Sequence, residues 1–159
     1  MNIFILNKNP VLAANDLCDK HTVKMVLETV QILCTVAHQK GFSAPYKPTH
    51  VKHPAVLWAG RSSANWNWLC EHGIGISQTY TKVYGKIHKC QSIIQELKNR
   101  TLEIWGHSLP SNEHTPFQLC MPDQYKVSDP VESYRNYYKG DKAYIAKWTN
   151  RQIPSWWHT

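Results

Sequence analysis

The sequence has little negative charge and no long apolar run. Only 11 of its 159 residues are Asp or Glu, against 18 Lys and Arg. No apolar run approaches the roughly 20 residues that cross a bilayer. Residues 1–7 are apolar but too short for a signal peptide and lack a basic leader. We therefore expect a cytoplasmic protein with no membrane partner.

Paired cysteine motifs and glycine-rich loops are also missing. The five cysteines are an odd number and widely spaced, which predicts reduced thiols. Cys18 and His21, and the two histidines in residues 50–53, are zinc-ligating types, but they form no paired motif, so we expect no metal. No phosphate-binding glycine loop, Gly-x-Ser-x-Gly or Rossmann pattern occurs, so we expect no cofactor.

Basic and aromatic residues are plentiful. The formal net charge is +7, and the chain has seven Trp and eight Tyr. Several of the aromatic residues lie among cations, as in residues 134–139. Cations hold phosphates while rings stack on bases, so this mixture favours a nucleic-acid partner. A basic protein that binds no polyanion is the alternative, because aromatic residues also build cores.

Helical patterns dominate the first two thirds of the chain. After a short extended segment at residues 2–6, Asn9 and Pro10 are typical of a helix start. Residues 13–38 lack Gly and Pro, and their apolar residues recur at intervals of three and four positions. This pattern predicts one long amphipathic helix. His53 and Pro54 begin a second helix. Gly73 and Gly75 then indicate a break or bend before a third helical stretch that runs to about residue 100.

Residues 101–128 contain three prolines and are predicted to be a long connection, a kind of loop that is often functional. Asp129 and Pro130 then predict a helix that runs through Tyr138, pauses at Gly140 and resumes to about Trp148. The aromatic ending at residues 154–157 is expected to dock on the protein. The whole chain, residues 1–159, is predicted to be one compact all-α domain.

Six polar residues share one face of the predicted first helix. Within an arc of about 100° lie His21, Lys24, Glu28, Gln31, Thr35 and His38. A solvated surface is one interpretation. However, Lys24 and Glu28 stand in the less favourable i,i+4 order, and the face mixes a titratable base, a cation, a carboxylate and an amide. This mixture keeps an active site open as the alternative.

Residues 17–28 resemble the first helix of the phage pyrimidine-dimer DNA glycosylases, which are also AP lyases. In that family a Leu-Ala-Asp-Gln-His segment is followed by an Arg-Glu pair. The family's Asp, His and Glu keep the spacing of Asp19, His21 and Glu28. Residues 134–146 are similar to the family's C-terminal segment, in which Trp-Tyr-Lys-Tyr-Tyr-Gly is followed by Lys-Ala. Both matches occur in the family's order.

The resemblance implies a helical fold whose N-terminal segment packs beside the first long helix. It also implies a nucleophilic N-terminal amine, of Met1 or of Asn2 if Met1 is removed. This amine attacks the sugar C1′ of a damaged nucleotide and forms a Schiff base, and β-elimination then cuts the strand. An α-amine is less basic than a lysine side chain, so more of it is neutral near pH 7. Glu28 would stabilise the cationic sugar and assist proton transfer, and His21 would lie at the DNA-facing site.

Two of the chain's departures from the family lie on the first helix. Leu27 and Gln31 stand where the family has arginines that contact DNA phosphates, and Lys24 could restore one cation. Beyond Lys24 and Gln31, the expected substrate contacts are His53 in the DNA-facing cleft, unless it caps its helix, and residues of the C-terminal helices: Arg135, Tyr137, Tyr138, Lys139 and Lys142.

We expect a monomer that binds double-stranded DNA. A non-catalytic nucleic-acid-binding protein, and an enzyme acting on other modified bases or nucleotides, remain the alternatives.

Overall fold

The computed structural model describes residues 1–106 and 114–158, which contain helices and turns but no strand. The predicted all-α class is thus confirmed. The helices are α1 (Pro10–Asn15), α2 (Asp19–Gln39), α3 (Pro54–Ala59), α4 (Ser63–Tyr84), α5 (Gln91–Asn99), α6 (Thr101–Trp105) and α7 (Pro130–Asp141). Three short 3-10 helices are η1 (Asp123–Tyr125), η2 (Ala143–Ile145) and η3 (Ser155–His158). No helix in these ranges is long and apolar enough to span a membrane.

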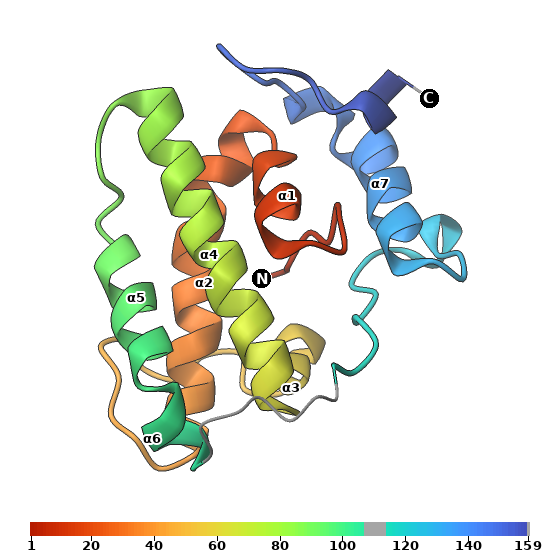
Figure 1. The fold of residues 1–159 in the computed structure, drawn as a ribbon. Helices are drawn as coiled ribbons and strands as arrows, with labels where there is room; N and C mark the ends of the chain where they lie inside the picture. The colour runs from red at the N-terminus through yellow and green to blue at the C-terminus, as the bar shows by residue number, and fades with distance from the viewer. Residues whose placement is uncertain (107–113, 159) are drawn as a thin grey trace.

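Helices α2 and α4 form the centre of the fold, with α5 on one side and α1 against α4 (Figure 1). Their close approach depends on Gly73 in α4. A Cβ at this position would lie 2.8 Å from both Thr29 Cγ2 in α2 and Ile94 Cδ1 in α5. The predicted break at Gly73 and Gly75 is therefore wrong, because both glycines are packing positions inside one helix. The chain breaks earlier, at Gly60, and α4 begins where the Ser62 hydroxyl caps it.

The predicted single helix over residues 13–38 is instead two helices, α1 and α2, separated at residues 16–18. Hydrogen bonds from the distant C-terminal segment satisfy the carbonyls that this break leaves free. Arg151 donates to the carbonyl of Leu17 at 2.8 Å, and the Trp148 indole donates to the carbonyl of Asp16 at 3.0 Å. A break stabilised by residues more than 130 positions away leaves no local signal in the sequence.

Helix α7 begins as predicted, with the Asp129 side chain accepting from the Val131 amide at 2.9 Å. The predicted pause at Gly140 and the continuation to Trp148 are wrong. Gly140 lies within α7 under the ring of Tyr125, and after Asp141 only η2 follows. The predicted connection at residues 101–128 contains α6 and η1, while Pro110 lies outside the described residues.

Both ends of the chain dock on the helices, as expected. At the C-terminal end, Trp156 is buried and its indole donates to Asp16 Oδ2 at 2.8 Å. At the other end, residues 3–6 are buried between α2 and α7. There, Phe4 stacks on His21 of α2, with ring centroids 4.2 Å apart, and meets Tyr138 of α7 edge-on. The N-terminal segment thus packs beside α2 and joins it to α7.

Replacing Gly73 by Ala is expected to destabilise the protein by about 1–2 kcal/mol, although Ala is the better helix former. The new methyl group has to displace the branched Thr29 side chain and the end of Ile94. Urea unfolding monitored by circular dichroism measures the change. The matched control is Gly60→Ala, where the nearest atom is 3.5 Å from the added Cβ and little change is expected. A Gly73→Ala protein as stable as the wild type would contradict this packing.

Candidate active site

The carboxylate of Glu28 is the centre of the site. Glu28 lies on α2 and is only 8% exposed. Its Oε2 accepts the backbone N–H of Asn2 at 3.0 Å, and its Oε1 lies 3.3 Å from Lys24 Nζ. A buried carboxylate is costly unless both oxygens have partners, and here both do. The Lys24–Glu28 pair thus compensates a buried charge on α2, against which the N-terminal segment lies.

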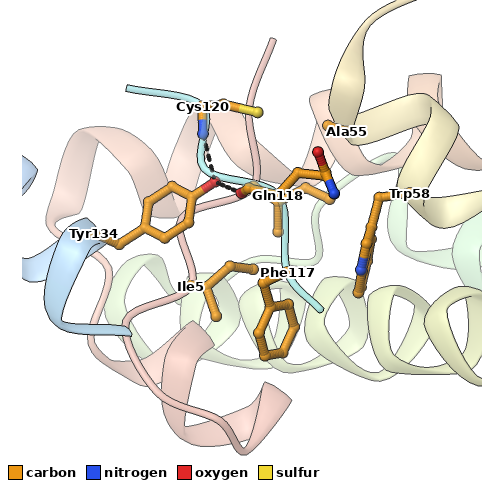
Figure 2. A pocket seen from close by; sticks show the side chains of 8 residues that line it. Ile5, Ala55, Trp58, Phe117, Gln118, Cys120 and Tyr134 are labelled. Atoms are coloured by element: carbon orange, nitrogen blue, oxygen red, sulfur yellow. Dashed lines mark hydrogen bonds between the residues drawn. The ribbon is translucent and has the colours of Figure 1, made fainter. Parts of the chain in front are cut away.

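Asn2 is held from its other side by the segment before η1. The Asn2 side-chain amide donates to the carbonyl of Cys120 at 2.9 Å. This segment is itself fixed by Tyr134 of α7, whose hydroxyl donates to the Gln118 carbonyl at 2.6 Å and accepts from the Cys120 amide at 3.3 Å (Figure 2). Apart from the length of the connection at residues 101–128, no sequence pattern predicts this support.

A small apolar cavity lies among Ile3, Ile5, Trp58, Phe117 and Tyr134, beside this segment (Figure 2). Its volume is about 10 Å³. A water molecule needs about 10–15 Å³ measured in this way, so the cavity has no room for a base or a sugar. It is a packing defect behind the N-terminal segment.

A larger, polar hollow opens in front of Glu28. Its volume is about 160 Å³, roughly ten times what one water requires. The residues that line it are Met1, Asn2, Phe4, His21, Lys24, Met25, Glu28, Tyr137 and Lys142. The structure thus brings together all four predicted catalytic residues. It also places three predicted substrate contacts there, namely Lys24, Tyr137 and Lys142.

His21 is a neutral group at the wall of this hollow. Burial, with smaller contributions from the nearby positive charges of Lys142 and Lys24, lowers the pKa of His21 to about 4. Its ring stacks on Phe4, and its Nδ1 lies 2.5 Å from the Tyr138 hydroxyl. The imidazole is therefore uncharged near pH 7 and held in one orientation.

Positive charge surrounds the carboxylate. Lys142 Nζ lies 5.0 Å from the ring centroid of Tyr137, and both Lys142 and Lys24 line the hollow. The two lysines outnumber the single carboxylate of Glu28. A polar hollow with this balance suits an anionic group such as a phosphodiester.

Two predicted substrate contacts have structural roles. Tyr138 is fully buried, so it has no free face to stack on a base, and its hydroxyl instead meets His21 and the Cys18 amide. His53 caps α3, since its Nδ1 accepts from the Ala55 amide at 3.1 Å. The pKa of His53 is lowered by burial and by the N-terminal amine, which places it near the site, although it does not line the hollow.

The remaining predicted contacts lie outside the hollow, and their role in binding stays a prediction. Arg135 is half-buried, donates to the Leu6 carbonyl at 3.0 Å and lies over the ring of Trp156. Gln31 is half-buried on α2, one turn after Glu28. Lys139 is half-buried on α7.

No three His, Cys, Asp or Glu side chains come together as a metal site in residues 1–106 and 114–158. All five cysteines are free.

Comparison with protein-family models, with curated proteins and with solved structures finds no match to the chain.

Buried neutral histidines are expected to make the protein sensitive to acid. Burial lowers the pKa of His72, like that of His21, from the ordinary histidine value of 6.5 to about 4. Between pH 6.5 and pH 4 these histidines take up protons in the unfolded chain but stay neutral in the folded protein. They therefore do not lower the free energy of unfolding above pH 6.5, and they lower it towards pH 4 by at most about 3 kcal/mol for each histidine.

Urea unfolding at several pH values between 7 and 4 measures this loss. His72→Phe should reduce the pH dependence, whereas the same substitution at the exposed His158 should leave it unchanged. Equal stability of the wild type at pH 7 and pH 4 would contradict the burial of neutral imidazoles.

Proposed function

We propose that the protein is a DNA glycosylase with AP lyase activity that uses the amine at its N-terminus as the nucleophile. The observation that carries the proposal is the contact of Asn2 N with Glu28 Oε2 at 3.0 Å inside a polar hollow. The resemblance of residues 17–28 and 134–146 to the pyrimidine-dimer glycosylases supports the same chemistry.

The proposed reaction begins when the neutral amine forms a bond to C1′ of the nucleotide. The base leaves with the electrons of the glycosidic bond and takes up a proton. The sugar ring then opens, and the nitrogen and C1′ form a protonated Schiff base. Loss of a proton from C2′ expels the 3′ phosphate and breaks the strand. Glu28 is suited to stabilise the cationic intermediates and to accept and return protons.

Two nitrogens are candidates for the nucleophile. With Met1 present, the nitrogen of Asn2 is an amide and is not nucleophilic, and the amine belongs to Met1, a residue that lines the same hollow. Removal of Met1 would turn the nitrogen that already contacts Glu28 into the amine.

Phosphate binding is assigned to Lys24 and Lys142, which both line the hollow. Lys24 has 69% of its side chain exposed, so it can contact a backbone phosphate while it remains near Glu28. Leu27 and Gln31, in place of the two family arginines, favour a substrate other than the pyrimidine dimer. An enzyme for other modified bases is therefore the second candidate.

Borohydride trapping tests the lyase chemistry. We expect a covalent adduct between the protein and duplex DNA that carries an abasic site. Glu28→Gln should reduce strand cleavage at least about 100-fold, because it removes the charge that stabilises the cation. DNA binding should change little.

The matched control is Glu71→Gln on α4, a half-exposed glutamate paired with Lys98, which should retain full activity. Tight DNA binding with no adduct on abasic, UV-irradiated or base-modified duplexes would refute the enzyme and leave a binding protein.

The identity of the nucleophile is tested by peptide mapping of the trapped adduct and by the intact mass of the protein. We expect the DNA remnant on the N-terminal peptide, at Met1 or at Asn2 according to the mass. Selective blocking of the α-amine should abolish cleavage. A blocked protein that still cleaves would instead identify a lysine such as Lys24.

A further inference from the structure

The buried hydroxyl of Tyr138 has three neighbours. The Cys18 amide donates to it at 3.3 Å, His21 Nδ1 lies 2.5 Å away, and the sulfur of Cys18 is 3.6 Å distant. Tyr138 is 0% exposed, so no solvent competes for these contacts. The single proton of the hydroxyl can go to the imidazole nitrogen or to the sulfur, and this choice decides where the proton of His21 resides.

Acid–base matching favours the imidazole as acceptor. A phenol is a good donor and a neutral imidazole nitrogen a good acceptor, whereas sulfur is a weak acceptor. The hydroxyl oxygen already accepts from the Cys18 amide, so donation to the imidazole uses the hydroxyl as both donor and acceptor. Burial raises the pKa of Tyr138 and lowers that of His21, so both groups stay neutral and the phenol keeps its proton. In this arrangement Nδ1 carries no proton.

The other ring nitrogen, Nε2, then carries the proton of the neutral imidazole. His21 lines the hollow, its Nδ1 edge is turned to the buried Tyr138, and its face is covered by Phe4 at 4.2 Å. In the part of the chain that the structure describes, Nε2 has no hydrogen-bond partner. It is the polar edge that remains for a ligand.

We propose that Tyr138 is a positioning residue that fixes His21 as the neutral Nε2–H tautomer, so that His21 donates a hydrogen bond to an oxygen of a sugar-phosphate in the hollow. The role of that bond in cleavage rests on the function proposed above, whereas the tautomer does not. His21 thus serves as a fixed donor and leaves proton transfer to Glu28. Lys24 and Lys142, which face the same hollow, disfavour a charged ring.

The tautomer is measured directly by ¹⁵N NMR of the histidine-labelled wild-type protein near pH 7. We expect the His21 proton on Nε2 and an unprotonated Nδ1. Binding of a duplex with a non-cleavable tetrahydrofuran site should shift the Nε2–H signal. A proton on Nδ1 in the free protein would overturn the proposal without reference to any activity.

The variant Tyr138→Phe keeps the ring and removes only the hydroxyl. We expect His21 to become a mixture of tautomers and the single-turnover cleavage rate to fall about tenfold, while affinity for the tetrahydrofuran duplex changes less. The matched control is Tyr46→Phe, which removes a tyrosine hydroxyl that contacts the sulfur of Cys90 at 3.7 Å, far from the hollow. That variant should keep the tautomer and the rate.

An unchanged tautomer in Tyr138→Phe would overturn the positioning role. If the Nε2–H tautomer and its loss in the variant are observed but no DNA is cleaved by the wild type, the proposed function fails and the positioning of His21 stands.

Discussion

The buried carboxylate of Glu28 constrains the rest of the site. A charge in this position needs compensation on both oxygens, and α2 alone supplies only Lys24. The second partner is the backbone N–H of Asn2, so the N-terminal segment has to lie against α2. Once it does, residues 3–6 fill the space between α2 and α7, and Phe4 is placed on the ring of His21. One electrostatic requirement thus arranges the terminus and the histidine together.

The C-terminal segment stabilises the same region at the N-terminus of α2. Asp19 accepts hydrogen bonds from Thr149 and Arg151, and although burial opposes it, these bonds lower the pKa of Asp19. Asp19 is one of the three residues that match the glycosylase motif, and in this structure it holds the C-terminal segment and does not line the hollow. The motif Asp19, His21 and Glu28 therefore combines one anchoring residue with two residues of the site.

Periodicity and capping are local signals, so they allowed the fold class, several helix caps and the shared face of His21, Lys24 and Glu28 to be predicted. The place of Met1 beside that face was implied only by the resemblance. The division of α1 from α2, the continuity of α4 through Gly73 and the burial of Tyr138 could not be predicted. Each depends on a partner distant in the chain: Arg151 for the break, Thr29 and Ile94 for the glycine, Cys18 and His21 for the tyrosine. An aromatic residue among cations can stack on a base or complete a core, and only the packing distinguishes the two.

The arrangement separates the charges of the site by depth. Glu28 lies inside, the exposed Lys24 and the half-buried Lys142 lie at the rim, and His21 between them is kept neutral. In the proposed reaction, a positive His21 would compete with the cationic sugar for the one carboxylate and would weaken its stabilisation. A neutral imidazole that only donates a hydrogen bond would leave the full charge of Glu28 to the proposed intermediate, and the lysines would remain available for phosphates. The burial of His21 against Phe4 and Tyr138 keeps the ring uncharged, which is what this division of roles requires.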